Sequence, residues 1–93
     1  MGVELSALNR ANCADTYSSA ATIIATGTKR ITIFVYNNAV LYQLAQDNAG
    51  SQWGVAESEL PPGFHSFARE CSGIRFRNLQ PGSIAIVSAK MLQ

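Results

Sequence analysis

The sequence predicts an all-β protein, a small antiparallel β-sandwich or jelly-roll-like barrel of six to eight strands with an extended N-terminal arm. Short runs of β-branched and aromatic residues alternate in side-chain character with a period of two. Turn residues interrupt these runs at intervals of about 8–12 residues, as in such folds. No helical period extends beyond one turn, and the 93 residues are predicted to form a single domain.

The N-terminal part divides into an arm and a first strand. Residues 1–17 are predicted to be an arm or loop, because they hold few large apolar side chains that would keep them on their own core. This arm is expected to reach a neighbouring molecule. The body then spans residues 18–93. Its first strand is predicted over residues 18–25, because Thr and Ile are β-branched, and it ends at Gly27.

Residues 30–36 give the clearest strand pattern in the chain. One face is predicted to carry Ile31, Ile33 and Val35, and the other Thr32, Phe34 and Tyr36. With apolar groups on both faces, this is predicted to be a central strand or one whose outer face meets a partner. Asn37-Asn38 then suits a two-residue hairpin loop, with residues 40–44 as the returning strand.

The second half of the chain is predicted to hold two short strands and a closing hairpin. Residues 55–60 form the first, ended by Pro61-Pro62-Gly63 because proline cannot donate to a strand ladder. Residues 64–68 form the second, followed by a turn at 69–72. Residues 73–91 are predicted to be a β-hairpin that turns at residues 80–83 and nucleates the sheet.

Composition limits the classes of partner. Charged residues make up 14% of the chain against about 25% in an average soluble domain. Either much of the surface is polar but uncharged, or partner subunits cover part of it; we favour the second, and expect a homo-oligomer. The net charge of +1 argues against binding nucleic acid or an anionic membrane by bulk charge.

No apolar run approaches the roughly 18 residues of a membrane span, and the N-terminal residues lack the pattern of a signal peptide. The protein is therefore expected to be made in the cytosol and not to associate with membranes. Cys13 and Cys71 have no further Cys or His at metal spacing, which excludes a zinc site and predicts two reduced thiols; the alternative is a Cys13–Cys71 disulfide. No cofactor is expected.

Two pairs of residues invite a catalytic interpretation. His65 lies six residues before Cys71, which invites a thiol–imidazole pair, but nothing in that spacing requires contact and no orienting residue or oxyanion hole accompanies them. Glu57 and Glu59 share one strand face about 7 Å apart, near the carboxyl separation of retaining glycosidases. We favour an ordinary histidine and a solvated edge face, and predict no catalytic residues.

The remaining polar and aromatic side chains suit contacts better than chemistry. Arg75 and Arg77 share a strand face and are predicted to pair with Glu57 and Glu59, or with an acidic patch on a neighbour, rather than with a ligand. Tyr36, Tyr42 and Trp53 are predicted to serve the core or an interface, with an aromatic ligand platform as the alternative. The candidate interface residues are Phe34, Tyr36, Tyr42, Trp53, Arg75 and Arg77.

One part of the sequence resembles a known class of protein. The segments 60–67 (LPPGFHSF), 71–78 (CSGIRFRN) and 80–87 (QPGSIAIV) resemble the C-terminal half of small structural proteins of tailed bacteriophages. The similarity covers about residues 30–91 and is one of general pattern. It implies a non-enzymatic virion component that is made in the host cytoplasm and binds the major capsid protein or another virion protein.

Within that class, the resemblance fits a capsid decoration (cement) protein, and almost equally a head-to-tail connector or tail-tip subunit. Two rival functions remain open. One is a free-standing carbohydrate- or ligand-binding module using Tyr42, Trp53 and the Arg75/Arg77 face, and the other is a small hydrolase using Cys71 and His65.

Overall fold

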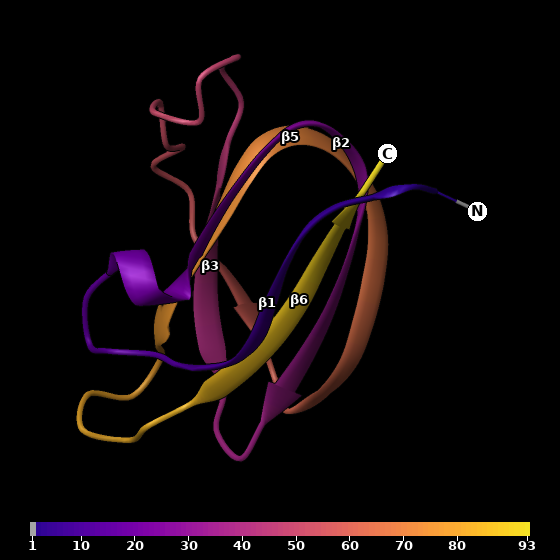
Figure 1. Ribbon diagram of the computed structural model, residues 1–93. Coiled ribbons are helices and arrows are strands. Elements are labelled where there is room, and N and C mark those ends of the chain that lie inside the picture. Colours follow the sequence, from indigo (N-terminus) through magenta and orange to yellow (C-terminus); the bar gives the residue numbers. More distant parts are fainter. Residues whose placement is uncertain (1) are drawn as a thin grey trace.

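The computed structural model describes residues 2–93, and within that range the protein is all-β, with six antiparallel strands joined in one sheet (Figure 1). The strands are β1 (Glu4–Asn12), β2 (Thr22–Tyr36), β3 (Val40–Ala45), β4 (Ser58–Leu60), β5 (Gly63–Asn78) and β6 (Ile86–Leu92). A single 3₁₀ turn, η1 (Ser19–Ala21), precedes β2. The strand order in the sheet is β1-β6-β2-β5-β3-β4.

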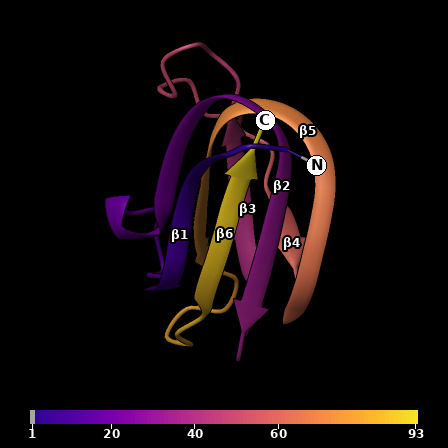
Figure 2. The ribbon, with the colours of Figure 1, turned by 45° about the vertical axis from the view of Figure 1, so that its right-hand side comes forward.

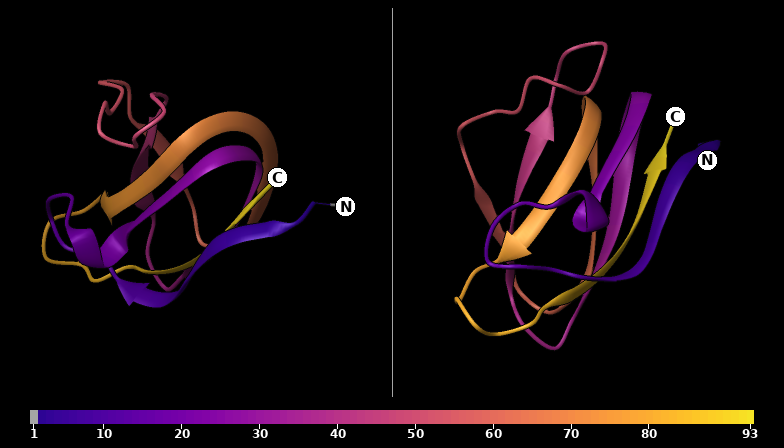
Figure 3. Two further views of the ribbon diagram at one scale, coloured as in Figure 1. Left: turned by 45° about the horizontal axis from the view of Figure 1, so that its top comes forward. Right: turned by 60° about the vertical axis from the view of Figure 1, so that its left-hand side comes forward.

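Two long, curved strands organise the sheet. β2 and β5 pair with each other from Thr22↔Arg75 at one end to Val35↔Gly63 at the other, and arch together (Figure 2). The register shifts twice between Ile24 and Arg30, where Gly27 has a φ of 88°. Such irregularities bend a strand pair. Beyond the bend β2 also pairs with β6, whereas the second half of β5 pairs with β3, so the sheet curls over on itself (Figures 2 and 3).

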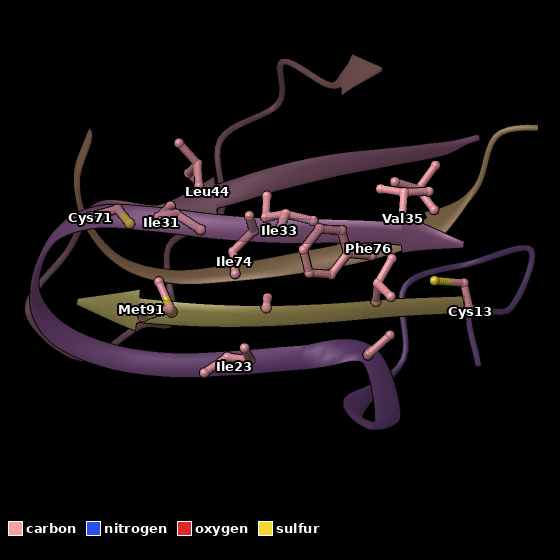
Figure 4. Packing of buried hydrophobic residues seen from close by; sticks show 14 of the residues in the cluster. Cys13, Ile23, Ile31, Ile33, Val35, Leu44, Cys71, Ile74, Phe76 and Met91 are labelled. Carbon is pink, nitrogen blue, oxygen red and sulfur yellow. The ribbon is translucent and has the colours of Figure 1, made fainter. Parts of the chain in front are cut away.

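The curl encloses one hydrophobic core (Figure 4). The predicted alternation in β2 is confirmed, since Ile31, Ile33 and Val35 are buried. From the other half of the curled sheet, β5 contributes Ile74 and Phe76, both fully buried. Each such side chain contributes on the order of 1.5–3 kcal/mol through the hydrophobic effect. The core therefore depends on the bend in β2 and β5, which brings the two halves together.

The predicted C-terminal hairpin is wrong, although both of its strands exist. β5 and β6 do not pair with each other: β5 lies between β2 and β3, and β6 lies between β1 and β2. A strand has only two edges, and those of β5 are already occupied. Residues 79–85 are therefore a connection across the curled sheet rather than a hairpin turn.

The predicted hairpin at Asn37-Asn38 is wrong for the same reason. Asn37 does adopt a φ of 38°, in the left-handed region, but β3 pairs with β4 and β5 instead of with β2. The side-chain amides of Asn37 and Asn38 both donate to the carbonyl oxygen of Ile84, at 2.8 and 3.1 Å. These two hydrogen bonds link the connection between β2 and β3 to the connection between β5 and β6.

Three predicted strand boundaries also need correction. The segment predicted as a strand over residues 18–25 begins as the 3₁₀ turn, and its strand runs on through Gly27 as part of β2. The predicted turn at residues 69–72 lies within continuous β5, because its partner β2 bends with it. The strand predicted over residues 55–60 is reduced to Ser58–Leu60.

Much of the predicted N-terminal arm is strand β1, which pairs with β6 at the end of the sheet. Backbone hydrogen bonds to β6 do not require large side chains, and Leu8 adds a contact with the core. The register shifts between Leu8 and Ala11, where Arg10 has a φ of 51°. Met1, part of the same prediction, lies outside the described residues.

Candidate functional site

Apart from Tyr42, which faces the core, the predicted interface residues fall on two outer faces of the curled sheet, on either side of the bend. We call the outer face of the second half of β5, with the loops that cover it, the arginine face; it holds Tyr17, Gln43, Trp53, Glu57, Arg75 and Arg77. We call the outer face of the second half of β2 and the first half of β5 the aromatic face; it holds Phe34, Tyr36 and Phe64, which stand on the side opposite to the buried residues of those strands.

On the arginine face, Arg77 forms a two-point ion pair with Glu57. Its Nε lies 2.8 Å from Oε2 and its Nη2 lies 3.0 Å from Oε1 of that carboxylate. The Tyr17 hydroxyl donates to the same Oε2 at 2.6 Å. The predicted pairing of Arg77 with a glutamate of the 57–59 segment is thus confirmed, and Tyr17, which no sequence pattern singled out, completes it.

Arg75 is held differently from the prediction. Its guanidinium lies between the rings of Tyr17 and Trp53, 4.4 and 4.6 Å from their centroids. Its Nε and Nη2 donate to Oε1 of Gln43 at 2.9 and 2.6 Å. Its direct partners are therefore an amide and two aromatic rings, and the hydrogen bonds predicted with a glutamate are not formed. The Trp53 ring also covers Gly73, since a Cβ built on that glycine would come within 3.1 Å of it.

The electrostatics of this face fix its charge states. The hydrogen bonds from Arg77 and then from Tyr17 lower the pKa of Glu57 to about 2. Burial, followed by the hydrogen bond to Glu57, raises the pKa of Tyr17. At neutral pH the glutamate is an ion-paired carboxylate and the tyrosine is a neutral donor. A general-acid role for Glu57, as a glycosidase requires of one carboxyl group, does not fit this arrangement.

Tyr36, Tyr42 and Trp53 do not form the aromatic ligand platform that was the alternative to a role in the core or an interface. Tyr42 lies on the inner side of β3, with ring centroids 5.9 Å from Phe67 and 6.5 Å from Phe76, so it serves the core. Trp53 belongs to the arginine face, and Tyr36 to the aromatic face beyond the bend. The strand pattern predicted aromatic residues at a surface but could not place them on a common one.

The aromatic face is the more open of the two. Phe34 and Phe64 are directly opposite in the β2–β5 register, and they are 42% and 65% exposed. Tyr36 packs beside Phe34 at 4.7 Å between ring centroids, and the Arg10 guanidinium lies 4.6 Å above the Tyr36 ring. Phe64 was not among the predicted interface residues, although it shares a strand face with polar Ser66, a signal that would have placed it on the outer side.

A groove of about 450 Å³ runs along the aromatic face between Phe34, Phe64 and strand β1. Ala7 and Leu8 of β1 and Lys90 of β6 form part of its lining. Its walls are largely apolar side chains, with charges at the rim. Largely apolar grooves of this kind are typical of surfaces that bind other molecules.

The thiol–imidazole pair, the alternative to an ordinary histidine, is not assembled. His65 and Cys71 are six positions apart on one strand, on the order of 20 Å along the backbone at about 3.3 Å per residue. The His65 Nε2 instead contacts the carbonyl oxygen of Pro61 at 2.8 Å. Both cysteines are free, as predicted. Both are also buried, and burial raises the pKa of Cys71 and raises that of Cys13 to about 11.

Comparisons with protein-family models, with curated proteins and with solved structures find no match for this chain. The resemblance to phage structural proteins therefore stays a prediction. Among residues 2–93 no cluster of three or more His, Cys, Asp or Glu side chains is placed to hold a metal ion. The same residues contain no helix of the length and apolar character needed to cross a membrane.

Proposed function

We propose that this protein is a non-enzymatic structural component of a tailed-phage particle, built as a small β-sandwich from its curled sheet. It assembles with copies of itself and with a larger shell protein through the aromatic face. The observation that carries this proposal is the exposure of Phe34 and Phe64 beside an apolar groove. Contiguous exposed apolar side chains on a small protein mark contact surfaces. The particle context depends on the resemblance alone.

The contacts are assigned to a face because neither sheet edge favours strand addition. At one edge, β1 is interrupted by register shifts near Ser6 and Arg10, and at the other β4 is only three residues long. Bulged and short edges are poor templates for pairing with another chain. The arm predicted to reach a neighbour is taken up by β1 from Glu4 onward, so the face must supply the contact instead.

A capsid decoration protein is the preferred role within this class, and a connector or tail-tip subunit is the alternative. The ligand-binding alternative finds less support. The hydrogen-bonding groups of Arg75 and Arg77 are engaged by Gln43 and Glu57, and Tyr42 faces the core. A sugar or phosphate would have to displace these internal partners before it could bind.

The proposal is tested on particles produced from the genome that encodes the chain. Quantitative mass spectrometry of purified particles is expected to find the protein in many copies. Phe64→Ser is expected to lower that copy number at least tenfold while the thermal midpoint of the isolated protein changes little. Ile84→Ser removes a comparably exposed side chain, 56% exposed, outside the groove and serves as the matched control. Particles without the protein, or full incorporation of the Phe64 variant, would refute the proposal.

A further inference from the structure

The loop that leads from β3 to β4 combines negative charge with a protruding apolar side chain. Residues 46–60, which we call the acidic segment, contain Asp47, Glu57 and Glu59 and no basic residue. Near its middle, Val55 is 96% exposed, the highest exposure among the large apolar residues described. A valine in this position has almost no contact with its own molecule.

The acidic segment is nevertheless held in place at both ends. The Asp47 carboxylate accepts hydrogen bonds from the backbone amides of Ser51 and Gln52 at 2.9 and 3.0 Å. Further along, Trp53 covers Gly73, and Glu57 is fixed by Arg77. Val55 therefore projects from a loop anchored on either side, which lowers the entropy lost when it inserts into a partner.

The rim of the groove carries the opposite charge. Arg30 and Lys90 lie on the outer side of β2 and β6, and Arg10 lies above Tyr36. Arg30 reaches only the Ser66 hydroxyl, at 3.2 Å, and within residues 2–93 neither it nor Arg10 forms an ion pair. Lys90 meets Glu4 at 3.8 Å, with both side chains more than half exposed. Glu4 and Lys90 both line the groove and offset each other, so the groove is apolar inside and its excess positive charge comes from Arg30 and Arg10 beside it.

The acidic segment and the groove cannot meet within one molecule. The segment extends from β3 and β4, at one end of the strand order, whereas the groove is lined by β1, β6 and β2 toward the other end, with Phe64 of β5 at its near side. Figure 1 and both views of Figure 3 show the loop projecting on the side of the molecule away from β1. Complementary surfaces on opposite sides of a molecule can join only different copies.

We propose that the acidic segment of one copy inserts Val55 into the Phe34–Phe64 groove of the next copy. This inference rests on the proposed assembly function and names the partner of the aromatic face, a second copy of this chain. The contact is head-to-tail, so it repeats and yields a ring or an open filament according to the rotation between copies. One loop in one groove buries less than the roughly 800 Å² per partner of a stable interface, so association in free solution is weak and concentration-dependent.

Sedimentation velocity tests this arrangement, over about 10 μM to about 1 mM, the range expected of a weak contact. The wild type is expected to exceed the 10.0 kDa monomer as concentration rises, and to dissociate as added salt screens the charges. Val55→Asp and Phe64→Asp should each remain monomeric. Ile84→Asp, an exposed apolar side chain outside both surfaces, should assemble like the wild type.

The decisive measurement mixes the two disabled variants. Val55→Asp retains an intact groove and Phe64→Asp retains an intact loop, so an equimolar mixture forms one contact and stops at a dimer. A face-to-face pairing of two grooves predicts instead that Val55→Asp dimerises by itself and forms no contact with Phe64→Asp. If Phe64→Asp loses its β-sheet circular dichroism, Ala7→Asp blocks the same groove from the exposed side of β1. A monomeric wild type at every concentration, a normally assembling Val55 variant, or a monomeric mixture would overturn the proposal.

The outcome separates this proposal from the proposed function. Abundant protein in particles together with a monomer in solution refutes head-to-tail association and leaves the structural role standing. Self-association together with absence from particles refutes the structural role and leaves head-to-tail association standing.

Discussion

Replacing Asn78 by alanine tests whether one buried amide locks the curled sheet closed. Asn78 is 3% exposed at the end of β5, and its Oδ1 accepts a hydrogen bond from the backbone amide of buried Ala85 at 2.9 Å. Its Nδ2 donates to Oδ1 of Asp15 at 3.0 Å, and its own amide donates to the Ala14 carbonyl at 2.8 Å. The loop after β1, the end of β5 and the residue before β6 are thus all hydrogen-bonded to one another through Asn78.

The expected cost follows from the Ala85 amide, which the Asn78→Ala variant leaves without a partner. A buried N–H without an acceptor costs about 1–3 kcal/mol, so we expect a loss of about 2 kcal/mol in the free energy of unfolding. For a domain of this size urea unfolding has a slope of about 1 kcal/mol per molar, which moves the midpoint down by about 2 M. A loss of about 2 kcal/mol is a large fraction of the roughly 5–15 kcal/mol by which a small domain is stable against unfolding.

Urea titration followed by circular dichroism measures this shift, with Asn38→Ala as the matched control. Asn38 also donates its amide to a backbone oxygen, but it shares the Ile84 carbonyl with Asn37 at the surface, so its loss should cost under about 0.5 kcal/mol. Equal midpoints for the two variants would show that Asn78 does not hold the segments together.

Three further outcomes follow from the same contacts. Arg77 lowers the pKa of Glu57 to about 2, so this carboxylate stabilises the fold above its unfolded-state pKa of 4.5 and loses that contribution as the pH falls toward 2. Glu57→Gln should flatten the acid-unfolding curve in that pH window, and an unchanged curve would refute the linkage. Phe76→Ala should cost about 3–5 kcal/mol in urea titrations, because the ring is fully buried where the halves of the sheet meet; a cost under about 1 kcal/mol would show a loose core. Cys13 and Cys71 should react with a thiol reagent at least a hundredfold more slowly in the native protein than in urea, since both are buried with raised pKa values; rapid native labelling would contradict their burial.

Side-chain alternation predicted which way residues point but not which strands pair. It correctly placed Ile31 and Ile33 on a common face, which the structure shows to be the buried one, and Arg75 and Arg77 on a common outer face. Period-two patterning specifies the faces of a strand, whereas its edges present the same backbone groups in every sequence. Consecutive strands were therefore predicted to form hairpins, and both predicted hairpins proved wrong because the neighbours come from distant segments.

Neither the bend in β2 and β5 nor the position of the loops over the arginine face could be predicted from the sequence, for different reasons. Gly27 was interpreted as a strand end, but in β2 its positive φ belongs to an irregularity that lets one strand serve both halves of the sheet. Tyr17 lies in a loop with no periodic pattern, so its contact with Glu57 depends on where tertiary packing places that loop. Such long-range contacts leave no local signal in a single sequence.

The β2–β5 pair gives a physical reason to expect a partner on one particular side. On the arginine face the chain covers its own strands, because Tyr17 and Trp53 enclose Arg75 from two separate loops. Beyond the bend, the same strand pair presents Phe34 and Phe64 with no comparable loop over them among the described residues. A chain with so few charged residues leaves this apolar half in water unless something covers it, and the hydrophobic effect favours any partner that does. The assembly that we propose would therefore gain the most free energy by covering this half of the strand pair.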